Sequence, residues 1–152
     1  MKRFLVLVSL FLLVSCGVRP TEIVRAGPAP ILPAGGEGAV LYFLSGEQLQ
    51  PASRATGQPL APAQAVELLL GGPTDAERSA GLVTKLPFTS GRVTLSGTTL
   101  TMPIPVLGLP EEAVQQLVCT AVRALAPTEQ HLGLFLAGRT GPLGYRECSA
   151  MT

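Results

Sequence analysis

Aromatic and charged side chains are scarce in this chain of 152 residues, which has no tryptophan, two tyrosines, five phenylalanines and only 14% charged residues. The formal net charge is +1, and the 11 lysines and arginines are scattered and form no basic patch. Nucleic-acid binding depends on basic surfaces and on aromatic rings that stack on bases. The composition therefore excludes nucleic acid as a partner.

Histidine and cysteine are also few, since His131 is the only histidine and the cysteines are Cys16, Cys119 and Cys148. No pair of cysteines or carboxylates stands near His131 at metal-ligand spacing, so we expect no metal site, and we expect no cofactor. A hydrolase needs a nucleophile with a base and an orienting group, or a metal with its ligands. We therefore expect no catalytic residues and interpret His131 as a strand-edge residue.

The longest apolar run lies at the N-terminus, where residues 4–14 follow two basic residues. A transmembrane helix needs about 20 apolar residues, so the run is typical of an export signal, which we assign to residues 1–15. It ends in Leu-Val-Ser-Cys, the pattern of a bacterial lipobox, in which the cysteine thiol receives a lipid and becomes the N-terminus. We expect lipidation of Cys16, as in palmitate-bearing lipoproteins, and a lipid-anchored location on the extracytoplasmic face of the cell membrane. The alternative is an ordinary secretory signal with an incidental cysteine.

The chain after the signal divides into a linker and one domain. Residues 16–38 are rich in proline and glycine, a composition that disfavours helix and cannot bury a core, so we interpret them as a tether. Residues 39–148 suit a single domain, with residues 149–152 as a C-terminal tail. Without Lys2 and Arg3 the mature chain carries nine basic and ten acidic side chains, so it presents no strongly charged surface.

The sharpest local signals lie in residues 62–87, PAQAVELLLGGPTDAERSAGLVTKLP. Apolar residues at helical spacing predict a helix over residues 62–71, which must end at the Gly-Gly-Pro sequence. Thr74 and Glu77 then form a T-x-x-E capping box, in which the threonine hydroxyl accepts from the amide of Glu77 and the glutamate carboxylate accepts from the amide of Thr74. A short second helix is expected from Asp75 to about Gly81.

The flanking segments predict strands and one longer helix. Residues 39–44 form an apolar run that indicates a strand covered on both faces or central in a sheet, and residues 48–53 indicate a short strand that Pro51 would confine to an edge. Alternation in residues 92–96 and 99–102 predicts a hairpin, and residues 131–136 predict the last strand. Apolar spacing predicts a helix over residues 110–126, whose adjacent Glu111 and Glu112 favour its positive end. Residues 138–144 are glycine-rich and are interpreted as a turn region without a phosphate loop.

These elements predict a single α+β domain in which two main helices pack on one face of a mostly antiparallel sheet. Once Cys16 is lipidated, two cysteines remain, and in an exported chain an even number favours a disulfide between Cys119 and Cys148. The alternative is two buried free thiols.

The sequence GGPT-x-x-E-R-x-x-GL-x-x-x-LP, preceded by an apolar helix, resembles the GerMN (sporulation and spore germination) domain, and the resemblance extends over about residues 39–148. It implies a small α+β domain outside the cytoplasmic membrane, often on lipoproteins, without known catalytic residues. The expected function is that of a non-catalytic interaction module of the cell envelope, related to sporulation, germination or envelope signalling. The alternative is a small exported enzyme such as a cell-wall hydrolase. We expect an envelope protein or the cell wall as partner, bound at the sheet edge near residues 48–53 or at residues 138–145.

Overall fold

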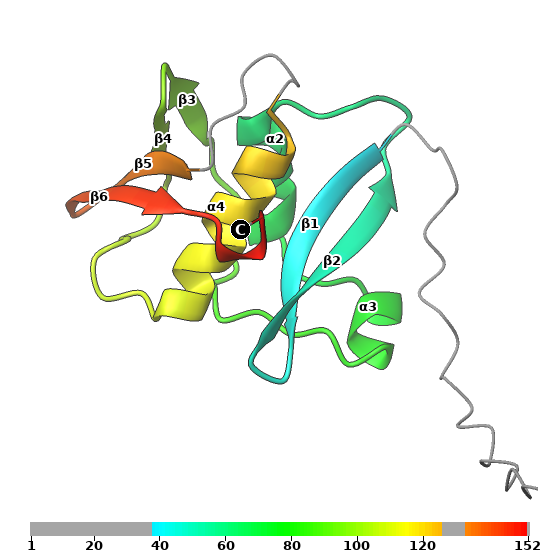
Figure 1. Cartoon of the computed structure of the whole chain (residues 1–152). Coiled ribbons are helices and arrows are strands. Elements are labelled where there is room, and N and C mark those ends of the chain that lie inside the picture. Colours follow the sequence, from blue (N-terminus) through cyan, green and yellow to red (C-terminus); the bar gives the residue numbers. More distant parts are fainter. Residues whose placement is uncertain (1–37, 126–132, 152) are drawn as a thin grey trace, which may run out of the picture. The chain divides into compact units, whose positions relative to one another are not determined.

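The protein was analysed as a computed structural model, which describes residues 38–125 and 133–151. Its elements follow in the order β1 (Gly38–Ser45), β2 (Gln48–Ala55), α2 (Pro62–Leu70), α3 (Asp75–Ser79), β3 (Thr94–Ser96), β4 (Thr99–Thr101), α4 (Glu111–Arg123), β5 (Gly133–Gly138), β6 (Gly141–Glu147) and the 3-10 helix η2 (Ser149–Met151). The predicted small α+β domain is confirmed (Figure 1).

The strands of the described residues form two sheets and not one. The first is the antiparallel hairpin β1–β2, and the second has the order β3-β4-β5-β6 with β4 and β5 as its parallel pair. Pairing is therefore mostly antiparallel, as predicted. Helix α4 lies between the two sheets and packs against α2, β1, β5 and β6 (Figure 1).

Strand β1 and helix α4 form the centre of the core. Leu41, Phe43 and Leu44 have no exposed surface, and Tyr42 retains 9%, so successive residues of β1 are buried on both of its faces. This confirms the prediction of a strand covered on both sides. Helix α4 is buried around most of its circumference because both sheets pack against it. The larger apolar side chains of the core that have no exposed surface are Leu41, Phe43, Leu44, Val66, Leu69, Leu100, Val106, Leu117, Val118, Leu134 and Leu136.

The glycine-rich segment after β5 corrects the sequence analysis. Residues 138–144 were predicted to be a turn region, but Gly141 begins strand β6, which pairs with β5 as far as Glu147. Gly144 pairs with Leu136 and Pro142 pairs with Ala137, so one extra residue of β6 forms a bulge. Gly141 and Gly144 have φ values of 125° and 95°, which residues with a Cβ rarely adopt. The glycines that suggested a turn therefore permit an irregular strand.

The other boundaries agree closely with expectation. Helix α2 begins with Pro62 at its first turn and stops at Gly71, and the predicted hairpin is formed by the shorter strands β3 and β4. Helix α4 ends at Arg123, before the predicted limit at residue 126.

The signal segment, Cys16, the tether and His131 lie outside the described residues. Within the described residues, no helix has the length and apolarity needed to cross a bilayer.

Candidate functional site

The disulfide joins α4 to the segment that follows β6. Cys119 and Cys148 are bonded with an S–S distance of 2.06 Å and a Cα–Cα distance of 4.8 Å, which confirms the predicted pair. Both residues have no exposed surface. While the bond is intact, neither sulfur is available as a thiolate nucleophile or as a thiolate metal ligand.

One turn earlier on α4, Gln115 holds the backbone on either side of Cys148. Its Nε2 donates to the carbonyl of Glu147 at 3.0 Å, and its Oε1 accepts from the amide of Ser149 at 2.9 Å. The amide side chain thus takes the place of a neighbouring peptide group. Gln115 and Cys119, four residues apart on one helix face, fasten the end of the second sheet to α4.

The adjacent pair Gln116 and Thr120 fastens the first sheet to the same helix. Thr120 Oγ1 accepts from the amide of Tyr42 at 2.9 Å, and Gln116 Nε2 donates to the carbonyl of Tyr42 at 3.1 Å. Gln116 Oε1 also accepts from the amide of Lys85 at 3.1 Å and from the hydroxyl of Thr84 at 3.2 Å. Both side chains are fully buried. Side chains of α4 therefore satisfy the backbone of β1 where a further strand is missing.

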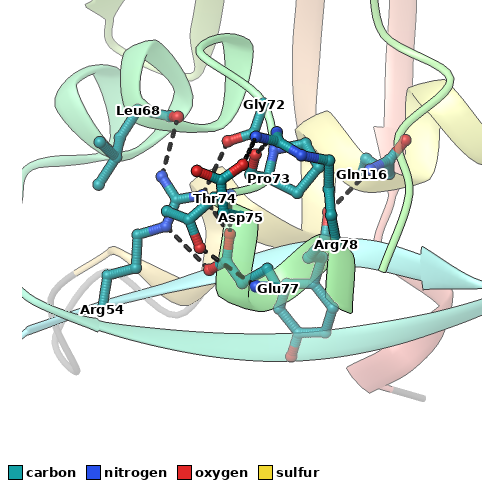
Figure 2. A network of polar contacts seen from close by, with 10 residues as sticks. Arg54, Leu68, Gly72, Pro73, Thr74, Asp75, Glu77, Arg78 and Gln116 are labelled. Atoms are coloured by element: carbon teal, nitrogen blue, oxygen red, sulfur yellow. Dashed lines mark hydrogen bonds and ion pairs between the residues drawn. The ribbon is translucent and has the colours of Figure 1, made fainter. Parts of the chain in front are cut away.

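The predicted capping box forms part of a larger network (Figure 2). The amide of Glu77 donates to Thr74 Oγ1 at 3.2 Å, and Glu77 Oε2 accepts from the amide of Thr74 at 2.7 Å. Arg54 of β2 donates to both carboxylate oxygens of Glu77, at 2.9 and 2.5 Å, and to the carbonyl of Gly72 at 2.8 Å. The guanidinium carbon also lies 5.4 Å from the centre of the Phe43 ring. The network ties the α2–α3 junction to the hairpin.

The charge of Glu77 is maintained by this network. Burial alone would raise the pKa of its carboxyl, but hydrogen bonds from Arg54 and from the amide of Thr74, together with the positive charge of Arg54, lower the pKa below its usual value. Side-chain exposure of 15% for Arg54 and 13% for Glu77 leaves little water between them. The T-x-x-E sequence thus serves fold assembly, and nothing in its geometry presents it to a ligand.

The acidic residues at the start of α4 have partners of their own. Glu112 Oε1 lies 2.7 Å from Lys85 Nζ, and this hydrogen bond lowers the pKa of Glu112. Glu111 accepts from Gln115 at 2.9 Å. Both line an open cleft of about 370 Å³ between the β1–β2 turn, the first turn of α4 and residues 149–150, where Glu47 supplies a third carboxylate. The predicted position of the two acids in the first turn of α4 is confirmed.

Strand β2 is an edge strand, as predicted, but its outer edge is unsuited to accepting another strand. Hydrogen-bonded and non-hydrogen-bonded pairs alternate along an antiparallel hairpin. The backbone groups of Tyr42 bind α4, so Pro51, which is opposite Tyr42, occupies a position whose amide would face outward from the hairpin. Proline has no N–H, so β1–β2 pairing is unaffected while the outer edge loses a central donor.

The outer edge of β6 is interrupted in the same way. Pro142 lacks an N–H, the carbonyl of Tyr145 accepts from the guanidinium of Arg146 at 2.7 Å, and the carbonyl of Glu147 is bound by Gln115. The two segments predicted to bind a partner, residues 48–53 and 138–145, are thus edge strands, but their backbones do not offer a continuous hydrogen-bonding ladder. A partner at either edge would have to contact side chains.

Among the described residues, no group of three or more histidine, cysteine, aspartate or glutamate side chains is arranged so that it could hold a metal ion. The structural residues that sequence reasoning missed include Arg54, Gln115, Gln116 and Thr120. A signal for two of them exists, since Gln116 and Thr120 are polar residues one turn apart and therefore share one face of the helix. Arg54 carries no such local signal because its acceptors lie on α3 and at the end of α2.

Compared with known proteins, the chain matches no family model, no curated protein and no solved structure.

Proposed function

We propose that the chain is a membrane-anchored extracytoplasmic lipoprotein and that its domain is a non-catalytic interaction module of the GerMN type. The observation that carries the proposal is Cys16, which directly follows an apolar run too short to span a bilayer as a helix. A lipid on this residue would hold the domain at the outer face of the membrane, and the proline- and glycine-rich residues up to 38 would separate the two.

The disulfide supports an exported location. Disulfides form and persist in oxidising compartments and are rare in the cytosol. Cys119 and Cys148 are buried and bonded, and they use both cysteines that remain once Cys16 is assigned to the lipid. The cysteine count thus fits a lipoprotein without a residue left over.

The side-chain chemistry of the described residues supports a binding role over a catalytic one. Glu77, Gln115, Gln116 and Thr120 hold elements of the fold together and are committed to backbone groups or to ion pairs. A module of this kind presents a rigid surface to a protein of the envelope or to the cell wall. Because the outer edges of β2 and β6 are interrupted, the partner is bound through side chains and not by strand addition.

Metabolic labelling with a clickable fatty acid tests the anchor. Cells expressing the natural chain are expected to label the protein, whereas cells expressing Cys16→Ala are not. Ser15→Ala is the matched control, because it keeps a small residue at the cleavage position and leaves the thiol in place. Label that persists in Cys16→Ala, or natural protein recovered wholly from the medium, would refute the anchoring.

Crosslinking in whole cells followed by mass spectrometry tests the module. A reproducible envelope partner is expected, with crosslinks on exposed side chains of the domain. Turnover of cell-wall material by the purified protein would instead favour an exported enzyme and would overturn the non-catalytic proposal.

A further inference from the structure

The loop between α3 and β3 is held against the end of α2 at two points. The amide of Thr89 donates to the carbonyl of Leu70 at 3.2 Å, and the amide of Val93 donates to Glu67 Oε1 at 2.7 Å. Residues 89–93 are therefore fixed on α2 at both ends. The hollow between them is preformed, because both of its walls are held by hydrogen bonds.

Phe88, at the start of this loop, presents an aromatic ring to solvent. It is 69% exposed, although its ring lies directly on Gly72. A Cβ at Gly72 would stand 2.0 Å from Phe88 Cε1, so the ring can approach the backbone this closely only because Gly72 has no side chain. One side of the ring therefore packs on the backbone at Gly72, and the rest of its apolar surface faces solvent.

Thr89, the residue after Phe88, belongs to the lining of an open cleft of about 430 Å³, which is formed by Glu67, Gly71, Thr89, Ser90, Gly91 and Arg92. This volume lies in the range of about 300 to 1,000 Å³ that small-molecule sites occupy. The cleft offers a carboxylate, two hydroxyls and a guanidinium. Arg92 is exposed and makes no hydrogen bond or ion pair within residues 38–125 and 133–151. Glu67 uses one oxygen for Val93 and has a second oxygen for a ligand.

We propose that Phe88 and this cleft form a binding site for a pyranose chain, with the cell-wall glycan as its source. The C–H groups on the face of a sugar ring are weakly positive and fit the negative face of an aromatic ring. Sugar hydroxyls both donate and accept, so they match a site in which a guanidinium donates, a carboxylate accepts and two hydroxyls do both. An inorganic anion fits less well, because the carboxylate of Glu67 would repel it.

The site rests on the proposed function, since a glycan partner requires the domain to lie outside the cytoplasmic membrane. It adds to that function by naming the ligand class and the residues that bind it. The contribution of the ring is separable from that of the cleft, because Phe88 supplies stacking and Arg92 supplies hydrogen bonds. Two single substitutions can therefore test the same site independently.

The full chain, purified in the non-glycosidic detergent lauryldimethylamine oxide, is titrated with chitotetraose, maltotetraose and inorganic phosphate in a calorimeter. We expect saturable binding of at least one oligosaccharide and none of phosphate. Phe88→Ala should weaken the oligosaccharide by about tenfold, and Arg92→Gln should weaken it as well. Phe135→Ala is the matched control, because Phe135 is also an exposed phenylalanine (47%) but lies on β5. It should bind like the natural chain.

The inference is overturned if neither oligosaccharide binds, if phosphate alone binds, or if Phe88→Ala binds as tightly as Phe135→Ala. A protein partner crosslinked in cells together with no oligosaccharide binding would remove this inference and leave the interaction module intact. If the natural chain takes up no fatty-acid label, the proposal of a membrane anchor is refuted, but the calorimetric binding of oligosaccharides is unaffected. The two proposals therefore fail separately.

Discussion

Replacing Gln116 by methionine should expose how the two sheets are held to one helix. The two side chains have similar length, so the substitution removes polar contacts while it largely fills the same volume. The carbonyl of Tyr42 loses its donor, and the amide of Lys85 loses its acceptor. The hydroxyl oxygen of Thr84 still accepts a hydrogen bond from the amide of Leu86, so this hydroxyl keeps a partner.

The magnitude follows from where the two groups lie. A buried group left without a partner costs about 1–3 kcal/mol, and the bond to Tyr42 is buried. The amide of Lys85 is nearer to solvent and should cost about 0.5–1.5 kcal/mol. We expect Gln116→Met to lower the free energy of unfolding by about 1.5–4.5 kcal/mol in total, a large part of the roughly 5–15 kcal/mol of a typical domain.

Urea unfolding of the oxidised protein measures this loss of stability. For a urea slope near 2 kcal/mol per molar, the urea concentration at the midpoint of unfolding should fall by about 1–2 M. Gln115→Met is the matched control, because it is the same chemical change at the adjacent position. Gln115 is only partly buried, so the backbone groups that it releases can bind water. Its cost should be about 0.5–1.5 kcal/mol.

If Gln116→Met and Gln115→Met lose the same free energy of unfolding, the reasoning is refuted, because burial of the contact with β1 would then add nothing to stability. A slope that changes between variants would instead indicate a change in the compactness of one of the states. In that case the free energies of unfolding extrapolated to zero urea are compared in place of the midpoints. Gln116→Met is again expected to lose more stability than Gln115→Met.

Two further predictions concern the disulfide and the capping network. Cys148→Ser should lower the free energy of unfolding by about 2–5 kcal/mol, and intact mass after alkylation without reductant should show no modified Cys119 or Cys148 in the natural chain; two modified thiols would contradict the bond. Glu77→Gln should destabilise the protein at neutral pH, because it breaks the pair with Arg54. Since the pKa of Glu77 is lowered by folding, its contribution is complete well above the usual value of about 4.3 and is lost as the pH falls below it. The difference between Glu77→Gln and the natural chain, measured by chemical denaturation from about pH 6 to about pH 3, should therefore shrink; a difference that grows would reverse the sign of the linkage.

Local signals predicted the parts of the fold that neighbouring residues decide. The end of α2 and the start of α3 follow from Gly71-Gly72-Pro73 and from the pair Thr74 and Glu77, whose interaction spans three residues. Strand β2 was also predicted with its edge position, because proline excludes the centre of a sheet. In each case the physical constraint is contained within a few residues of sequence.

Strand β6 and the polar contacts of α4 could not be predicted in this way. Gly141 and Gly144 disfavour a strand locally, and pairing with β5 overrides that preference. Gln116 and Thr120 bind Tyr42 across sequence separations of 74 and 78 residues, so their role depends on the completed fold. The division of the strands into two sheets follows from the same contacts, because α4 occupies the edge that a connecting strand would need.

The disulfide also has a mechanical consequence. A pulling force applied to the last residues of the chain enters at Cys148 and passes through the S–S bond directly to Cys119, 29 residues earlier in the sequence. From α4 it is transmitted through Gln116 and Thr120 to β1, the first described strand. Strands β5 and β6 lie within the covalent loop and bear none of this tension. Among the described elements other than η2, only those before Cys119 can therefore open to lengthen the chain under force, and reduction would add the enclosed residues to its extensible length.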